Sequence, residues 1–316
     1  MKILWSMDFS RDSKAALRFS SHLGFPKDSE GLLLHVITTA KELKKLGHAS
    51  DFAEQLNRLR TNMIDRARRN LQKLADQFMP ATRTHRVLVR EGNAGEEILS
   101  VLNSEQVDLA VFGTRGLSGI KRFFLGSVSD WVVQEAPCPV LVVRGAGRLV
   151  DRGMRILMAT DGSPEGQGAV EFLNRFSFPP KTEIVLFHVI EPVDYTVVQD
   201  DFTILGVGRS GLQELQEWSK AVQRKRELAQ TALLQQTKRA IHRRNVKVEK
   251  IAVGYAAEEI IKAASRFRAD LIVMGSRGLT GVRKTFLGSV SGRVARHAPC
   301  SVLVVRAVKK TNTPPV

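Results

Sequence analysis

The chain has 316 residues, of which 43% are hydrophobic and 25% charged, and a formal net charge of +16; this composition is that of a globular protein long enough for two domains. Two cysteines are too few for a disulfide framework, no apolar run approaches the roughly 20 residues of a membrane span, and residues 1–9 are too short and mixed for a signal peptide. We therefore expect a cytoplasmic protein that does not associate with membranes.

The first half of the chain alternates apolar runs, typical of buried strands, with stretches of helical periodicity. Strands are predicted at residues 2–7, 32–37, 83–90, 107–112 and 139–144. Helices are predicted from Ser10 to about residue 23, at 52–78, from about 96 to 103 and from about 128 to 135. Ser10 can cap the first helix, and Gly24 and Pro26 end it. Residues 38–50 are polar and basic and fit neither pattern, and 145–152 resemble a linker.

The same alternation starts again in the second half. Strands are predicted at residues 154–159, 184–190, 246–253, 271–274 and 302–305. Helices are predicted from Ser163 onward, at about 212–243, at 257–267 and at about 289–296. Residues 195–211 form a long connection, and 309–316 are predicted to be disordered. The expected domains are therefore 1–145 and 153–307, followed by a flexible tail at 308–316.

Equivalent residues recur at constant spacing, which indicates an internal duplication. Asp8 and Asp161 are 153 residues apart, as are His35 and His188. Three later pairs are all 162 residues apart: Gly113 with Gly275, Ser127 with Ser289, and Cys138 with Cys300. The nine extra residues of the second copy therefore lie between its second and third strands.

Each half thus carries five strands that are apolar on both faces and separated by helices. That pattern is typical of a parallel sheet covered by helices on both sides. The predicted fold class is α/β, with two Rossmann-like, doubly wound domains of five parallel strands each. Ligands of such sheets bind beyond the carboxyl ends of the strands. The residues at these ends include Asp8, Val36 and Gly113 in the first half, and Asp161, Val189 and Gly275 in the second.

A glycine-rich motif follows the fourth strand of each half and leads into a helix. It reads Gly113-Thr114-Arg115-Gly116, nine residues, Gly126-Ser127 in the first half, and Gly275-Ser276-Arg277-Gly278, nine residues, Gly288-Ser289 in the second. Glycines at such a turn let backbone N–H groups approach an anion, and the helix N-terminus favours negative charge. The sequence therefore predicts two phosphate-binding loops, with tight turns that hold no ligand as the alternative.

With these motifs in both halves, the chain resembles a tandem universal stress protein over nearly its whole length. The resemblance rests on the Gly-x2-Gly-x9-Gly-Ser/Thr motif of the family's nucleotide-binding members and on the aspartates that end the first strands. It extends to Leu34-His35-Val36, Phe187-His188-Val189 and the Ala-Pro-Cys before each fifth strand. The resemblance implies that the two domains pack about a pseudo-twofold axis, often through the fifth strands, as a pseudo-dimer within one chain. A homodimer of two chains is left open.

The resemblance further implies that ATP or a related nucleotide binds in each crevice, with Asp8 and Asp161 near the ribose. The residues implied to line the adenine pocket are Val36, Phe112, Val189 and Met274. The residues implied to hold the phosphates, or to follow them in the same loop, are Gly113, Gly116, Gly126, Ser127 and Val128, and Gly275, Gly278, Gly288, Ser289 and Val290. Arg115 and Arg277 lie within the loops and either meet the phosphates or remain solvated.

Several of these residues have a structural alternative. Asp8 and Asp161 also suit a turn at the end of a strand. His35 and His188 are expected to be hydrogen-bonded strand-end histidines, since no Cys/His/Asp cluster accompanies them. Ser127 and Asp130 match a capping box, whereas the second copy has Gly292 in place of the acid. This difference, with the longer second connection, predicts that the two sites are unequal.

The function predicted from these features is that of an ATP-binding regulatory protein of the stress response. Neither a P-loop lysine nor a nucleophile elbow is present in the sequence, which favours binding over catalysis. A slow Mg²⁺-dependent ATPase or phosphotransferase is one alternative. A polyanion-binding protein that uses the positive charge is the other, although the Arg-rich helices lack the interleaved aromatics of a nucleic-acid stacking surface.

Overall fold

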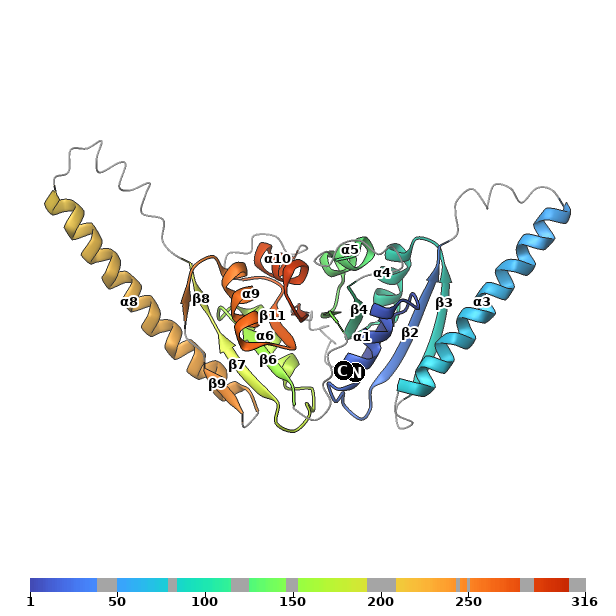
Figure 1. The fold of residues 1–316 in the computed structure, drawn as a ribbon, viewed down its shortest axis with the longest axis horizontal. Coiled ribbons are helices and arrows are strands. Elements are labelled where there is room, and N and C mark those ends of the chain that lie inside the picture. Colours follow the sequence, from blue (N-terminus) through green and yellow to red (C-terminus); the bar gives the residue numbers. More distant parts are fainter. Residues whose placement is uncertain are drawn as a thin grey trace, which may run out of the picture.

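A computed structural model describes residues 1–38, 50–78, 84–114, 125–145, 153–191, 209–242, 245–248, 251–278 and 287–306. The first half consists of β1 (Lys2–Ser6), α1 (Arg11–Ser21), β2 (Glu30–Ile37), α3 (Ser50–Phe78), β3 (His85–Glu91), α4 (Ala94–Ser104), β4 (Leu109–Gly113), α5 (Ser127–Glu135) and β5 (Val140–Val143). Figure 1 shows the two halves side by side, with the N-terminus near their junction.

The second half consists of β6 (Arg155–Ala159), α6 (Pro164–Leu173), β7 (Glu183–Phe187), β8 (Val189–Ile190), α8 (Arg209–Ala240), β9 (Val246–Val248), β10 (Ala252–Val253), α9 (Ala256–Phe267), β11 (Leu271–Gly275), α10 (Ser289–His297) and β12 (Ser301–Val305). It repeats the order of the first half, except that β7 and β8 stand in place of β2, and β9 and β10 stand in place of β3. The predicted α/β fold with parallel, doubly wound sheets is confirmed.

The two sheets join into one ten-stranded sheet, in the order β3-β2-β1-β4-β5-β12-β11-β6-β7-β9. The strands of each half are parallel, and the junction is an antiparallel pairing of β5 with β12, in which Leu141 lies opposite Leu303. The fifth strands therefore bring the halves together about a pseudo-twofold axis, as the family resemblance implies. Phe25 and Phe176 add an edge-to-face contact across the junction, with their ring centroids 5.8 Å apart.

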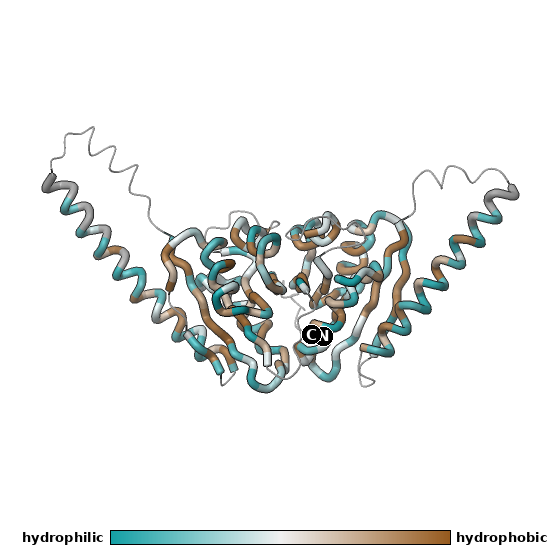
Figure 2. The backbone as a smooth tube through the Cα atoms, viewed as in Figure 1, coloured by the Kyte–Doolittle hydropathy of each residue, from teal (hydrophilic) through white to brown (hydrophobic). Residues whose placement is uncertain are grey.

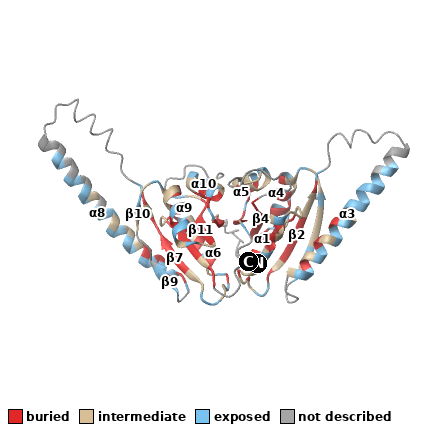
Figure 3. Cartoon of the chain, viewed as in Figure 1, coloured by how far each residue is buried: buried red, intermediate tan, exposed pale blue. Residues whose placement is uncertain are grey.

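Each face of the sheet carries its own helix layer and its own apolar core. One core contains residues of α1, α3, α6 and α8, and the other contains residues of α4, α5, α9 and α10. Figure 2 shows the hydrophobic residues concentrated in the strands, and Figure 3 shows the same strands as the most buried part of the chain. The strands are apolar on both faces because each face is covered by helices.

Local signals account for the helix boundaries. The Ser10 hydroxyl accepts a hydrogen bond from Ser13 N at the start of α1, and the Ser163 hydroxyl accepts one from Gly166 N at the start of α6. A side-chain oxygen of this kind satisfies one of the free N–H groups of a helix N-terminus. Among the described residues, no helix is long and apolar enough to cross a membrane.

The two strands predicted at 184–190 and 246–253 are each divided in the structure. Leu186 pairs with Val248, and Val189 pairs with Ala252, so the ladder gains one residue on the β9–β10 side. An extra residue interrupts a ladder and changes the direction of the strand. As a result β8 and β10 form a separate two-stranded sheet, whereas β2 and β3 of the first half stay in register through Glu91.

Two candidate ligand-binding sites at the carboxyl ends of the strands

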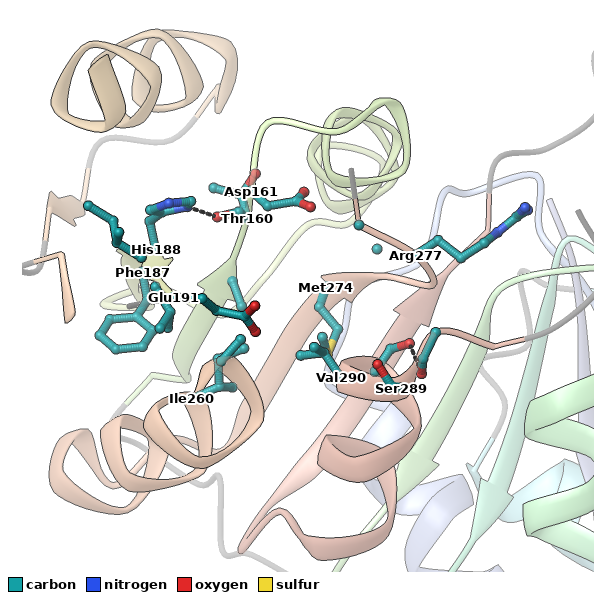
Figure 4. A pocket seen from close by; sticks show the side chains of 18 of the residues that line it. Thr160, Asp161, Phe187, His188, Glu191, Ile260, Met274, Arg277, Ser289 and Val290 are labelled. Carbon is teal, nitrogen blue, oxygen red and sulfur yellow. Dashed lines mark hydrogen bonds between the residues drawn. The ribbon is translucent and has the colours of Figure 1, made fainter. Parts of the chain in front are cut away.

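The second half contains a cavity of about 800 Å³ at the carboxyl ends of its strands. Its walls come from the ends of β6, β7 and β11, from β8, from α8 and α9, and from the start of α10. All nine residues predicted for the second site line this cavity: Asp161, Val189, Met274, Gly275, Arg277, Gly278, Gly288, Ser289 and Val290. Figure 4 shows Asp161, Met274, Arg277, Ser289 and Val290 around it.

One wall of the cavity is apolar. Ile260 and Met274 belong to a buried hydrophobic cluster, and Val189 and Val290 pack against that cluster while facing the cavity. The wall therefore joins residues from a strand end, from α9 and from the start of α10. A flat, largely apolar group such as a purine base fits against a surface of this kind.

A carboxylate stands beside the glycine loop of this half. Asp161 Oδ1 accepts hydrogen bonds from Ser163 N at 3.0 Å and from Ser163 Oγ at 2.6 Å. A Cβ atom added at Gly278 would lie 2.6 Å from Asp161 Oδ2, which is closer than non-bonded atoms can approach. A side chain at this position would displace the carboxylate or the loop, and Asp161 forms a polar side of the cavity.

The N-terminus of α10 opens on the same cavity. Its N-cap is Gly288, which provides no side-chain cap, and Ser289 and Val290 form its first turn. Free N–H groups at a helix N-terminus, together with the helix dipole, make a binding site for anions. Arg277, by contrast, has its Nε 3.7 Å from Glu165 Oε1, and Figure 4 shows its side chain extending away from Asp161 and Met274.

The strand-end histidines are hydrogen-bonded to backbone, as expected. His35 Nδ1 lies 2.6 Å from Met7 O, and His188 Nδ1 lies 2.7 Å from Thr160 O. Each bond ties the second strand of a half to the first, at the edge of the candidate site. Across the described residues, no group of three or more His, Cys, Asp or Glu side chains is arranged to hold a metal ion.

The first half has a smaller cavity, of about 160 Å³, at the equivalent place. Seven of the nine residues predicted for the first site line it: Asp8, Val36, Phe112, Gly113, Gly126, Ser127 and Val128. The other two, Arg115 and Gly116, lie outside the described residues. The predicted inequality of the two sites therefore corresponds to a fivefold difference in the volume enclosed.

Two sequence differences accompany the difference in volume. Phe9 occupies the position that is Gly162 in the second half, and its ring lies against His35 with a centroid distance of 4.7 Å. The long helices also differ, because α8 supplies Arg226 and Gln230 to its cavity, whereas no described residue of α3 lines the first cavity.

Sequence reasoning missed the contribution of α8. Leu71 in α3 and Leu234 in α8 are both buried against the sheet. The positions four and eight residues before them are Ala67 and Met63 in α3, but Gln230 and Arg226 in α8. The Gln230 amide oxygen is buried and has no hydrogen-bond partner among the described residues. The sequence signal that accompanies this wall is a polar pair on the helix face that carries a buried leucine, and the pattern by itself does not place that pair at the cavity.

The capping-box interpretation of Ser127 is wrong. The N-cap of α5 is Gly126, Ser127 is the first helical residue, and no side chain caps this N-terminus. Asp130 instead accepts hydrogen bonds from Gln134 Nε2 and Arg296 Nε. The glycine at the N-cap leaves the Ser127 hydroxyl at the cavity, in the same place as Ser289 in the second half.

Known proteins with the same arrangement identify the family. A model of the universal stress protein family matches the chain twice, at residues 1–144 and 154–306. The chain belongs to the universal stress protein family. A universal stress protein from Mycolicibacterium smegmatis is 28% identical over 315 residues, which cover 96% of each chain. The tandem organisation predicted from the sequence is thereby confirmed.

Single-domain relatives and solved structures agree with this assignment. The universal stress protein YxiE of Bacillus subtilis is 31% identical over 149 residues, which cover 45% of this chain and 98% of its own. The crystal structure of a universal stress protein from Archaeoglobus fulgidus has a TM-score of 0.61 at 23% identity, over 96% of this chain and 98% of its own. That structure and this one share the tandem fold.

Proposed function

We propose that the cavity of the second half binds an adenine nucleotide, with ATP as the first candidate, and that its occupancy regulates the stress-response role of this universal stress protein. The observation that carries the proposal is the meeting of three surfaces in one cavity. Val189, Met274 and their neighbours form an apolar wall, Asp161 supplies a carboxylate, and α10 opens its uncapped N-terminus.

Each surface matches one part of a nucleotide. An apolar wall suits the base, and a carboxylate at a strand end accepts hydrogen bonds from ribose hydroxyls. Phosphates accept hydrogen bonds from the N–H groups of a helix N-terminus. Mg²⁺ would arrive with a triphosphate, since it is bound chiefly by phosphate and carboxylate oxygens.

The cavity volumes support one principal site for each chain. Small-molecule pockets typically enclose about 300–1,000 Å³, and the second cavity, of about 800 Å³, falls within this range. The first cavity encloses about 160 Å³ and does not. We therefore propose that nucleotide binds first in the cavity of the second half. The first half would retain the same fold and pair with the second half at the junction.

The distribution of charge on α3 favours this proposal over a polyanion-binding role. Three of its arginines form ion pairs within the chain: Arg58 with Glu54, Arg60 with Glu91, and Arg68 with Asp65. These pairs neutralise part of the basic face that a polyanion would need. Both cysteines are buried and free, which supports our proposal of a reducing, cytoplasmic location.

Isothermal titration of the full chain with ATP, with and without Mg²⁺, tests the proposal. We expect one binding event for each chain, with a weaker second event at most, and weaker binding of GTP if the apolar wall selects adenine. No heat of binding, together with no nucleotide retained on purification, would refute it. Light scattering on the same sample distinguishes a single-chain pseudo-dimer, which we propose because β5 and β12 already pair, from a homodimer.

A further inference from the structure

Two arginines cross the junction between the halves in the same way. Arg144 follows β5 and donates from its guanidinium to Ala295 O at 2.7 Å and Arg296 O at 2.6 Å. Arg306 follows β12 and donates to Val133 O at 2.8 Å and to Gln134 O. Arg144 and Arg306 are 162 residues apart in the sequence, as are their acceptors, so one contact is made twice with the halves exchanged.

The acceptors are carbonyl groups at the C-terminal ends of α10 and α5. The last four carbonyls of a helix have no partner within it, and the helix dipole places negative charge there. A guanidinium satisfies two such carbonyls with charge-assisted hydrogen bonds, which are about twice as strong as neutral ones. Each half therefore completes the last turn of a helix that belongs to the other half.

Both helices begin at a candidate phosphate-binding loop. Helix α10 starts at Ser289 in the second cavity, and α5 starts at Ser127 in the first. With nine residues, α10 is about 13 Å long at 1.5 Å for each residue, so its two ends move together. Ser291 Oγ fixes the loop end of α10 by donating to Ser276 O at 2.6 Å, and Arg144 fixes the other end.

An ion pair also crosses the junction, and it is formed in one direction but not in the other. Arg296 in the last turn of α10 pairs with Asp130 in the first turn of α5, with Nε 2.7 Å from Oδ1. The equivalent positions in the other direction are Gln134 and Gly292, which cannot form an ion pair. Helix α10 is thus held from the first half by Arg144 at its terminal carbonyls and by Asp130 at its side chain.

We propose that Arg144 is a positioning residue for the ligand site of the second half: supplied by the first half, it sets the orientation of α10 and therefore of the N–H groups that receive the anionic end of the ligand. This rests on the proposed function for the choice of ligand. On this proposal the first half, whose own cavity is small, has a role in ligand binding, because it completes the site of the second half.

The pseudo-twofold symmetry provides a matched control. Arg144→Met removes the hydrogen bonds to the C-terminal carbonyls of α10, and Arg306→Met removes the equivalent hydrogen bonds to α5. We expect similar decreases in Tm for the two variants. We expect the Kd for ATP at the second site to rise about fivefold or more in Arg144→Met, the lower end of typical coupling between sites, and to rise by less in Arg306→Met, which removes only a charge that interacts with Arg277 of that site.

Two further measurements separate positioning from loss of stability and from failure of the proposed function. Arg144→Lys keeps a cation but lacks the planar guanidinium, and it should recover part of the affinity that Arg144→Met loses. Hydrogen exchange of the ligand-free full chain should be faster at residues 289–291 in Arg144→Met but not in Arg306→Met. Equal effects of the two variants on exchange at these residues, or no effect of either, would overturn the proposal even if ATP proved not to bind.

Discussion

Replacing Gly278 by valine is the substitution that separates the candidate ligand site from the rest of the fold most cleanly. A Cβ at this position would lie 2.6 Å from Asp161 Oδ2, and the neighbouring contact to Asp161 Cγ is 3.7 Å. Non-bonded atoms cannot remain at 2.6 Å, so either the loop or the carboxylate moves. Both belong to the cavity, whereas the hydrophobic core beneath the loop does not include Gly278.

The expected loss of affinity follows from this clash. Because Gly278 is exposed and the clash is with the end of a side chain, we take the cost as that of moving the carboxylate off its rotamer, about 0.5–1.5 kcal/mol, and each 1.4 kcal/mol corresponds to about a tenfold change in Kd. We therefore expect Gly278→Val to weaken ATP binding by about 2- to 12-fold. The change in Tm should be small, because loops at a cavity rim contribute little to global stability.

Gly168→Ala is the matched control, because nothing lies within 4 Å of a Cβ added there. It lies in the interior of α6 of the same half and should leave Kd close to that of wild type, while Tm rises slightly because alanine is the better helix former by about 1 kcal/mol. Isothermal titration and thermal unfolding of the three proteins supply the comparison. Wild-type affinity in Gly278→Val would show that the Asp161–Gly278 contact has no part in ligand binding, and our account of the site would then be wrong.

Three further predictions concern the rest of the molecule. Burial raises the pKa of the Cys138 and Cys300 thiols to about 12, so at pH 8 the thiolate is scarce and neither should react with a thiol reagent until the chain is unfolded; rapid native-state labelling would contradict this. Gly24 has φ +61°, and a Cβ there would lie 1.9 Å from Ser177 O across the junction. Gly24→Ala should therefore lower the free energy of unfolding by about 3 kcal/mol. A Tm like that of wild type would show that Gly24 and Ser177 are not in contact as described. Because the buried Gln230 amide oxygen has no described partner, Gln230→Leu should raise the free energy of unfolding of the ligand-free chain by about 1 kcal/mol, and denaturant titration showing a loss would reveal a partner.

The fold was largely predictable from the sequence because its signals are local and occur twice. Ser10 and Ser163 cap their helices as predicted, and the apolar strands occupy the predicted order of a doubly wound sheet. The division of the strand predicted at 184–190 was not predictable. It accompanies a one-residue change of register between the β7–β9 and β8–β10 pairings, and such a change leaves the hydrophobic pattern of the strand itself unaltered.

The site residues at strand ends were predictable from the sequence. The site residues contributed by α8 were not, because their position depends on how that helix is rotated and placed over the sheet. Val189, Met274 and the glycine loop sit at strand ends, and parallel strands bring their carboxyl ends together. Arg226 and Gln230 reach the cavity only because α8 crosses the sheet at a particular rotation and height, which periodicity alone does not specify. The volumes of the two cavities also depend on packing. The sequence shows that Phe9 and Gly162 differ at equivalent positions, but it does not show which of the two cavities is larger.

Photo-crosslinking of the full chain with an azido-adenine analogue of ATP, followed by peptide mapping, tests the central claim most directly. Our account predicts that ATP-protected label appears in second-half peptides from the apolar wall, around Val189, Ile260 or Met274. Arg144→Met and Gly278→Val should each reduce that label at a fixed, subsaturating concentration. Protected label confined to first-half peptides around Val36 or Phe112, or label that excess ATP fails to displace, would contradict the account.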